Sequence, residues 1–307
     1  MKVVFLGTSI FALPSIRALY NSEDIELVMV VSRPDRRSGR GRKISRPPVA
    51  KLADQLGIKL LQPEKLREIK DLLEKISPDV MVSASYGGWL PGWFLTIAPL
   101  GVVNIHPSLL PAHRGAAPVV RAVLHGDKET GVCFMKTDEG WDTGDILHTV
   151  NMKIEENQTA GELEKALSES ASEVLPWVLE KYSQGEIVPL PQSGAESYAE
   201  KVTAEETFIS WQNSAEEVRR MILAFNPVPG ARTLNRSKIL KIYSAEVFST
   251  KMKGMPGQVL EIAPLVIGCR EGALKLLEVQ PEGRRRMSSD EFVRGYRIMK
   301  GALLSEK

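Results

Sequence analysis

Over roughly the first 185 residues, short runs of β-branched residues alternate with segments of helical periodicity, and this alternation limits the possible folds more than any other feature. The runs predicted as strands are residues 3–6, 25–31, 59–61, 80–84 and 102–105. The segments predicted as helices are residues 11–20, 49–56, 65–76 and 118–125, with a long closing helix over 160–182. Such alternation predicts an α/β fold with a Rossmann-like, doubly wound and mostly parallel sheet, which residues 131–135 and 146–152 could extend.

A polar segment, residues 189–205, contains Pro189, Pro191 and Gly194 and is predicted to be a linker. It separates residues 1–188 from residues 206–307, so we expect two domains.

The second domain is predicted to be a small OB-like β-barrel. Ser214 with Glu217, and Ser288 with Glu291, are capping boxes that predict the starts of two helices. Between them lie short strand candidates, separated by Gly and Pro turns, at residues 238–244, 257–262, 265–267 and 273–279. Many short strands in a domain of this size favour a barrel, and the OB-like type commonly binds nucleic-acid strands.

Composition excludes several classes of protein. The 307 residues are 43% hydrophobic, enough for well-packed cores. The two cysteines, Cys133 and Cys269, lie in apolar contexts without further Cys or His at ligand spacing, so we expect neither a disulfide framework nor a metal site. No apolar stretch approaches the roughly 20 residues that span a bilayer, and the chain begins without a signal-peptide pattern. We therefore expect a cytoplasmic protein without membrane contact. A monomer is a separate expectation.

The charge distribution suggests a polyanionic partner. The net charge is only +2, but residues 206–307 hold 17 Lys and Arg against 11 Asp and Glu, whereas residues 1–205 hold 23 against 27. Residues 33–46 concentrate seven basic side chains around Asp35, and these are Arg33, Arg36, Arg37, Arg40, Arg42, Lys43 and Arg46. A solvated surface loop is one interpretation of this run. Because Gly39 and Gly41 interrupt it, a flexible segment that orders on contact with phosphates is the other.

An amide, an imidazole and a carboxylate are the candidate chemical groups. Asn104 and His106 stand two residues apart at the end of an apolar run, so on a strand they point the same way. Asp142, in a turn bounded by Gly140 and Gly144, could complete an acid/base group without a Ser or Cys nucleophile. This combination suggests direct transfer between bound substrates. The alternatives are a solvated histidine and a turn carboxylate that caps local amides.

Three further features are less specific. The turn Gly7-Thr8-Ser9 lacks the Gly-x-Gly-x-x-Gly spacing of dinucleotide sites, so it is either a plain tight turn or a turn that faces a ligand. His113 and His148 are expected at the surface.

These motifs carry a family resemblance. The stretches Asn104-Ile105-His106-Pro107-Ser108-Leu109-Leu110-Pro111 and Asp142-Thr143-Gly144-Asp145 resemble the 10-formyltetrahydrofolate-dependent formyltransferases. The opening turn, the basic loop, Ala224-Phe225-Asn226-Pro227 and Gln280-Pro281-Glu282-Gly283 resemble the members of that family that act on methionyl-tRNA, and the resemblance runs essentially end to end. The chain departs from the family pattern at three positions. Trp141 stands where the family usually has an aliphatic residue, and His113 and Val228 stand where Trp is common.

The resemblance implies an α/β catalytic domain, an OB-like barrel that binds tRNA, and transfer of the formyl group of 10-formyltetrahydrofolate to the α-amino group of methionine on initiator tRNA. It implies that Asn104 holds the formyl oxygen, that His106 donates to the oxyanion or to the leaving N10, and that Asp142 pairs with His106. It implies that the reaction needs no metal. It implies folate-binding roles for Tyr86, Gly87, Gly88, Trp89, Leu90, Ser108, Leu109, Leu110, Pro111, Asp138, Gly140 and Trp141. For Trp89 and Trp141, core packing is the alternative. It implies contact with the acceptor end of the tRNA for Arg36, Arg37, Arg40, Arg42 and Lys43.

Two other functions stay open at this point. One is a formyltransferase that acts on a small amine, such as glycinamide ribonucleotide or an amino-sugar nucleotide. The other is a catalytically silent RNA-binding protein, in which the barrel binds RNA and the α/β part is a scaffold.

Overall fold

The computed structural model describes residues 1–38, 43–252 and 254–305. The chain divides into two compact units. The first unit comprises Met1–Pro118, Glu129–Lys153 and Glu164–Ala199. The second comprises Val119–Lys128, Ile154–Leu163 and Glu200–Lys307. Each unit is therefore assembled from three separate stretches of chain.

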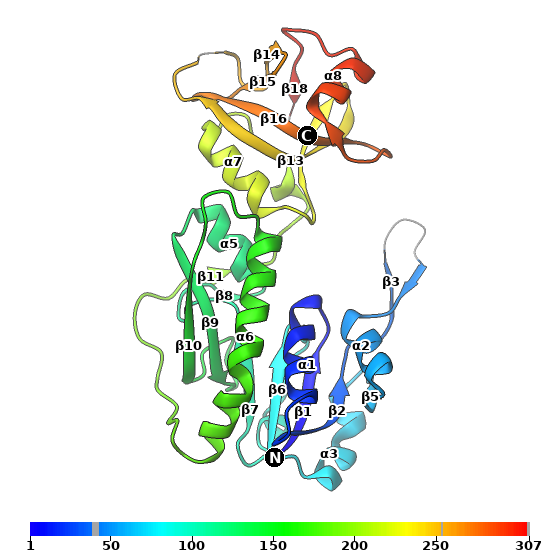
Figure 1. The fold of residues 1–307 in the computed structure, drawn as a ribbon, viewed down its shortest axis with the longest axis vertical. Coiled ribbons are helices and arrows are strands. Elements are labelled where there is room, and N and C mark those ends of the chain that lie inside the picture. Colours follow the sequence, from blue (N-terminus) through cyan, green and yellow to red (C-terminus); the bar gives the residue numbers. More distant parts are fainter. Residues whose placement is uncertain (39–42, 253, 306–307) are drawn as a thin grey trace. The chain divides into compact units, whose positions relative to one another are not determined.

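The first unit is built on a seven-stranded sheet with the order β10-β9-β7-β6-β1-β2-β5 (Figure 1). Its five parallel strands are β1 (Lys2–Gly7), β2 (Glu26–Val31), β5 (Leu60–Leu61), β6 (Val80–Ala84) and β7 (Val102–His106). Strands β9 (Glu129–Lys136) and β10 (Ile146–Lys153) extend it in antiparallel orientation. The connection between these two is too short for a parallel crossover, so a hairpin results. The predicted α/β fold with a Rossmann-like, mostly parallel sheet is confirmed.

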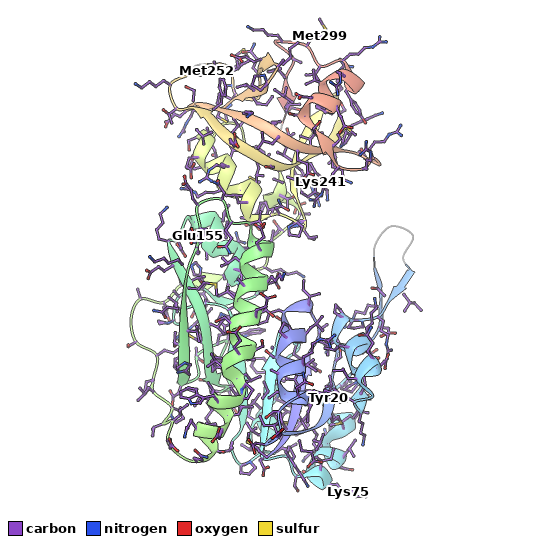
Figure 2. The ribbon with its side chains drawn as sticks, in the orientation of Figure 1. Tyr20, Lys75, Glu155, Lys241, Met252 and Met299 are labelled. Atoms are coloured by element: carbon purple, nitrogen blue, oxygen red, sulfur yellow. The ribbon has the colours of Figure 1, made fainter. Side chains whose placement is uncertain are left out.

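The predicted helices are present with small changes at their ends. The regular helices are α1 (Leu13–Tyr20), α2 (Pro48–Leu56), α3 (Lys70–Ile76), α4 (Gly92–Leu95), α5 (Pro118–His125) and α6 (Ala160–Ser183). Two of them follow 3-10 turns, η1 (Ile10–Ala12) and η2 (Leu66–Ile69). Figure 2 shows the side chains of the same view, with Tyr20 at the end of α1 and Lys75 in the last turn of α3. No helix in the described part of the chain has the length and apolarity to cross a membrane.

One face of the sheet packs on the η2–α3 segment. Val4 and Leu6 of β1 are fully buried and contact a cluster that includes Met81, Leu73 and Phe94. Central parallel strands are covered on both faces, which explains why β6 is apolar along almost its whole length. The burial fixes the carboxyl ends of β1, β6 and β7 at one edge of a rigid sheet.

In the first unit, two short pairings were not predicted. Strands β3 (Arg36–Ser38) and β4 (Lys43–Ser45) form an antiparallel hairpin, where the sequence predicts a loop. Strands β8 (Arg114–Gly115) and β11 (Tyr198–Ala199) pair in parallel, so residues of the expected linker are bonded to the first unit.

The second unit contains an antiparallel sheet with the order β14-β15-β16-β13-β12-β18. Its strands are β12 (Ala231–Asn235), β13 (Lys238–Ser249), β14 (Val259–Ile262), β15 (Leu265–Gly268), β16 (Ala273–Pro281), β17 (Met287–Ser288), which pairs with β16, and β18 (Leu304–Ser305). The two ends of the sheet meet, because the Leu304 amide donates to Gly257 (2.8 Å) and the Val259 amide donates to Ala302 (2.8 Å). The sheet thus curls into the small barrel that the sequence predicts.

Besides α5, which belongs to this unit from Val119 on, the unit contains two capped helices and a 3-10 turn. Helices α7 (Ala215–Ala224) and α8 (Ser289–Tyr296) begin at the predicted capping boxes, and the turn is η3 (Glu205–Thr207). The barrel core surrounds Trp211, whose indole Nε1 donates to Thr233 Oγ1 (3.1 Å). The one polar atom of this large buried ring is thereby satisfied.

An ion pair within the second unit makes stability depend on pH. The Glu206 carboxylate accepts from Arg121 Nη1 (2.6 Å) and from the Thr203 amide (2.7 Å), and these contacts lower the pKa of Glu206 to about 2. A lowered folded-state pKa stabilises the fold at a pH above the ordinary value of 4.5 and ceases to do so as the pH falls toward 2. Because the carboxylate is partly solvated, we expect Glu206→Gln to lower the free energy of unfolding by about 1 kcal/mol at pH 7.

Denaturant unfolding of both proteins between pH 7 and pH 3 measures this effect. The difference between wild type and Glu206→Gln should shrink as the pH falls. A difference independent of pH would contradict the role given to the Glu206 charge.

Candidate active site

Strand β7 presents the amide and the imidazole. It lies between β6 and β9, with Asn104 opposite Ser83 on one side and Met135 on the other, and with His106 opposite Cys133. Asn104 is half-buried, and His106 is only 4% exposed. The interpretation of His106 as a solvated histidine is therefore wrong, because the carboxyl end of β7 lies inside the unit.

Asp142 reaches His106 from the turn between β9 and β10. One carboxylate oxygen lies 3.6 Å from Nδ1 of His106 and also accepts the Gly115 amide (2.9 Å). The other ring nitrogen, Nε2, lies 3.0 Å from the backbone oxygen of His113. Because a carbonyl oxygen can only accept, Nε2 carries a proton and donates it there. An oxygen atom thus faces each nitrogen of the imidazole.

The turn that carries Asp142 is so compact that Gly140 and Gly144 have no room for a side chain. A Cβ on Gly144 would lie 1.8 Å from the backbone oxygen of Lys136, and a Cβ on Gly140 would lie 2.0 Å from Thr143 Oγ1. The Asp138 carboxylate accepts from the Thr143 hydroxyl (2.8 Å) and from the Gly140 amide (3.0 Å). Asp138, which is predicted to bind folate, therefore also holds the turn together.

Two of the predicted folate-binding segments meet at a pair of tryptophans. Trp89, after β6, is 55% exposed and Trp141 is 69% exposed, with ring centroids 5.6 Å apart. Exposure on this scale excludes the alternative of core packing. Two large apolar rings in solvent beside backbone glycines are suited to bind a flat heterocycle.

Tyr86 forms the inner end of the same segment. It is buried, and its backbone oxygen accepts the hydroxyl of Thr8 (2.8 Å) from the turn after β1. Burial raises the pKa of Tyr86, and the neighbouring Arg33 guanidinium, 5.9 Å from the ring centroid, opposes this. Thr8 and Arg33 are neighbours of the site that the sequence did not assign to it, although the Gly7-Thr8-Ser9 turn was a signal.

The loop after β7 is anchored on β9. Ser108 Oγ donates to the Ala112 carbonyl (2.6 Å), and the Leu110 amide donates to Sγ of Cys133 (3.4 Å). Burial raises the pKa of the Cys133 thiol, so this sulfur contributes packing rather than a nucleophile. The peptide bond between Leu110 and Pro111 is cis. The predicted residues Leu109 and Pro111 belong to the same loop.

The expectation for His113 is wrong. It is buried rather than exposed at the surface, and its backbone has a φ of +57°. Its amide donates to Ser197 Oγ (2.9 Å), an interaction across 84 residues that no local pattern indicates. His148 is half-buried against Trp177, and burial lowers the pKa of its ring.

The residues of the basic run differ in their surroundings. Arg46 donates to Asp54 (2.9 Å) and Gln62 (3.1 Å), so its charge is already paired within the unit. Arg36, on β3, is exposed. Arg37 and Lys43 lie on the hairpin, whereas Arg40 and Arg42 lie outside the described residues.

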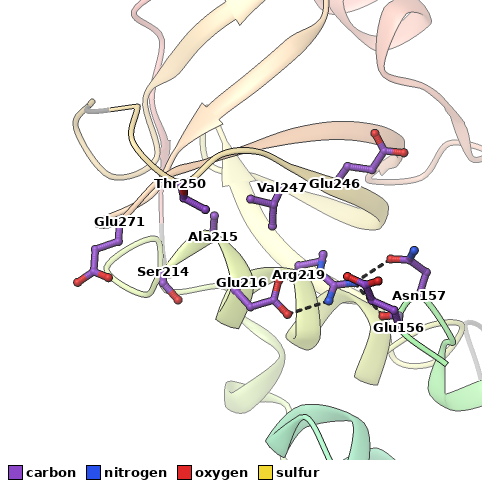
Figure 3. Close-up of a pocket in the computed structure, with 10 residues that line it drawn as sticks. All are labelled: Glu156, Asn157, Ser214, Ala215, Glu216, Arg219, Glu246, Val247, Thr250 and Glu271. Carbon is purple, nitrogen blue, oxygen red and sulfur yellow. Dashed lines mark hydrogen bonds and ion pairs between the residues drawn. The ribbon is translucent and has the colours of Figure 1, made fainter. Parts of the chain in front are cut away.

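A hollow of about 560 Å³ lies in the second unit, apart from all the predicted site residues (Figure 3). Arg219, which is almost fully buried, donates to Glu216 (2.7 and 2.9 Å), to Asn157 (2.8 Å) and to the Glu156 carbonyl (2.9 Å). The lining of the hollow includes four carboxylates, from Glu156, Glu216, Glu246 and Glu271. This charge does not suit a phosphate-rich ligand.

Comparison with known families decides between the possible classes. A family model described as formyl transferase matches residues 1–179, and one described as formyl transferase, C-terminal domain, matches residues 201–297. The chain belongs to the formyl transferase family. The two matches together cover most of the chain.

Relatives of this formyl transferase match it over its full length. It is 40% identical over 309 residues to a methionyl-tRNA formyltransferase of Caldanaerobacter subterraneus subsp. tengcongensis, covering 99% of this chain and 100% of that enzyme. It is 42% identical over 312 residues to a methionyl-tRNA formyltransferase of Neisseria meningitidis serogroup C, covering 99% and 100%.

Solved structures share the fold of this formyl transferase at low identity. An N-formyltransferase of Helicobacter canadensis, in complex with folinic acid and dTDP-3-aminofucose, has a TM-score of 0.65 at 17% identity, covering 92% of this chain and 99% of that one. HypX of Aquifex aeolicus, in complex with tetrahydrofolic acid, has a TM-score of 0.64 at 18% identity. This formyl transferase is covered completely in that comparison but spans only 51% of the HypX chain.

Proposed function

We propose that this chain transfers the formyl group of 10-formyltetrahydrofolate to the α-amino group of methionine carried by initiator tRNA. The observation that carries the proposal is full-length identity of about 40%, through both parts of the chain, with enzymes named methionyl-tRNA formyltransferase. The contact between His106 and Asp142 on the same strand end as Asn104 supports the chemistry.

The nucleophile belongs to the substrate. An α-amino group has a pKa of about 7.7 to 8, so a useful fraction is neutral near pH 7 without a strong enzymic base. The new bond joins the amine nitrogen to the formyl carbon, the bond from that carbon to N10 breaks, and the proton released by the amine is returned to N10. The enzyme must therefore place the amine, stabilise negative charge on the formyl oxygen and move one proton.

The named residues suit these tasks. Asn104 is proposed to donate its amide N–H to the formyl oxygen. His106 Nε2–H, which donates to the His113 carbonyl in this structure, is proposed to exchange that acceptor for the formyl oxygen or N10. Asp142 would keep the ring oriented through Nδ1 and balance its charge. When bound, the folate supplies the formyl group.

The residues present fit a folate. Trp89 and Trp141 offer exposed apolar rings. Gly87 and Gly88 have no side chains, so their own backbone groups are accessible to the polar edge of a pterin. We propose that the predicted pocket residues Tyr86, Gly87, Gly88, Trp89, Leu90, Ser108, Leu109, Leu110, Pro111, Asp138, Gly140 and Trp141 form this site.

The basic elements are proposed to bind tRNA. We propose a catalytic part over residues 1–188, a connecting segment over 189–205 and a tRNA-binding part over 206–307, with Arg36, Arg37, Arg40, Arg42 and Lys43 against the acceptor end. The net positive charge of residues 206–307 supports this division. A monomer acting in the cytoplasm, where initiator tRNA is charged, is part of the same proposal, and sedimentation velocity tests the monomer.

Reversing one charge on the hairpin tests the tRNA contact. We expect Arg36→Glu to raise the KM for the tRNA several-fold and to reduce the slope of log affinity against log salt by about 1, because a phosphate contact is lost. Arg67→Glu reverses another exposed arginine, on η2, and should change neither quantity. Equal effects of both variants on tRNA binding, or loss of folate binding in Arg36→Glu, would contradict the assignment.

Transfer of a labelled formyl group tests the function itself. The enzyme is offered methionyl initiator tRNA, methionyl elongator tRNA and free methionine in parallel. Selective labelling of the initiator species is expected. Labelling of none of them, with transfer to an amino-sugar nucleotide or to glycinamide ribonucleotide, would favour the small-amine alternative, and absence of any folate-dependent turnover would favour a silent RNA-binding protein.

A further inference from the structure

Residues 190–199 form a strap that hydrogen-bonds to several parts of the first unit. Leu190 exchanges two backbone hydrogen bonds with Ile146 at the start of β10 (2.8 and 2.9 Å). Ser197 bonds the loop after β7 through Pro111 (3.2 Å) and Arg114 (2.9 Å). A segment with these contacts helps to fix the positions of the site loops.

Within the strap, Gln192 holds the turn of Asp142 directly. Its Nε2 donates to the backbone oxygens of Asp142 and Gly144, both at 2.8 Å. Its Oε1 accepts from Nη2 and Nε of Arg114 (2.7 and 3.2 Å). Arg114 is only 8% exposed, and its remaining Nη1 is paired with Glu196 (2.6 Å). The amide of Gln192 is therefore held in one orientation.

The backbone of Asp142 lies in the left-handed region, with a φ of +54°. Residues other than Gly are uncommon there, although Asp is one of those that adopt it more readily. The side chain of Asp142 is held separately, by the amide of Gly115 (2.9 Å). Gly115 follows Arg114 in the chain, so the backbone and the side chain of Asp142 are both held by groups connected to Arg114.

We propose that Gln192, oriented by Arg114, is a positioning residue that sets Asp142 against the imidazole of His106. The inference rests on the proposed function, because it assigns Gln192 a role in that reaction. Gln192 touches no reacting group. It acts through the backbone of Asp142, whose Oδ2 lies 3.6 Å from His106 Nδ1.

Two variants separate the donor function of Gln192 from its contact with Arg114. Gln192→Ala removes both functions, whereas Gln192→Glu keeps an acceptor for Arg114 but removes both donors. We expect either change to lower kcat about 10- to 100-fold and to raise the KM for folate by a smaller factor, since misplacement of a catalytic group lowers turnover more than binding and Trp141, proposed to bind folate, precedes Asp142 in the same turn. Ser193→Ala, at the exposed neighbouring position, should leave kcat unchanged. Full activity of Gln192→Glu would overturn the proposal.

A double-mutant cycle tests whether Gln192 acts through Asp142. In an Asp142→Ala background, Gln192→Ala should cause no further loss of kcat, because the group that it positions is gone. Losses that multiply would show a role independent of Asp142 and would overturn the proposal. The wild-type enzyme in the same assay reports on the proposed function separately.

Hydrogen exchange tests the positioning role of Gln192 without an activity assay, and so separately from the proposed function. The Gly115 amide donates to Asp142, so its hydrogen exchange reports on the position of that carboxylate. Exchange at Gly115 should become faster in Gln192→Ala and stay unchanged in Ser193→Ala. Unchanged exchange in Gln192→Ala would overturn the positioning role even if the wild type transferred formyl groups normally.

Discussion

Replacing His106 by alanine should lower kcat for formyl transfer by roughly 10²- to 10⁴-fold, the usual contribution of a general acid or base. The imidazole is 4% exposed, its Nε2 faces a backbone carbonyl at 3.0 Å and its Nδ1 faces the Asp142 carboxylate at 3.6 Å. It is therefore held in place before the substrates bind, and its loss removes a donor rather than a binding surface. The KM for folate should change little. Single-turnover transfer of labelled formyl measures the chemical step.

His148→Ala is the matched control. This histidine belongs to the same unit, on β10, where its ring packs 5.1 Å from the ring of Trp177. Its removal should change kcat less than twofold, since packing contacts alone are lost. If His106→Ala were as active as His148→Ala, the assignment of His106 as proton donor would be wrong.

Replacing Asn104 by alanine should lower kcat about 10²- to 10³-fold, the cost of losing one donor to a developing oxyanion. The side chain leaves a strand bonded on both sides, so it needs little reorganisation to meet the formyl oxygen. Asn104→Asp, which is nearly isosteric, should be worse still, because it places a negative charge beside the developing negative charge. The two kcat values, measured at saturating folate, decide between an electrostatic role and a steric one.

Asn151→Ala controls for the loss of an amide elsewhere. Asn151 lies exposed on β10, and its replacement should leave kcat unchanged. An Asn104→Asp enzyme with wild-type turnover would contradict a role of Asn104 in stabilising the oxyanion.

The local patterns predicted the elements well because their causes are local. The capping boxes at Ser214 and Ser288 start helices at those residues, since a side chain three positions away supplies the second hydrogen bond. The two-residue spacing of Asn104 and His106 placed both on β7 for the same reason. From the residues alone, Asp142 was one possible member of an acid/base group, and its pairing with His106 followed from the family resemblance, because the contact needs the hairpin of β9 and β10.

The failures have causes distant in the sequence. His113 is buried, and its amide donates to Ser197, which lies 84 residues later in the chain. The polar residues of the strap predict a linker, and nothing in the sequence near Gln192 indicates that Asp142 will lie beside it. The departure of His113 from the family pattern is also less severe than the substitution suggests, since its backbone carbonyl, rather than its side chain, meets His106.

The three-part assembly of the second unit limits how this enzyme could exchange parts in evolution. Residues 154–163 supply Glu156 and Asn157 to Arg219, and the Gly161 amide donates to the Asn226 carbonyl (3.0 Å). A gene fragment that began at Glu200 would encode the barrel without these partners and would leave the buried guanidinium of Arg219 with only Glu216. Recombination that moved the barrel to another catalytic body would therefore have to carry matching insertions from the earlier half of the gene, so the two parts are constrained to diverge together rather than to shuffle as independent modules.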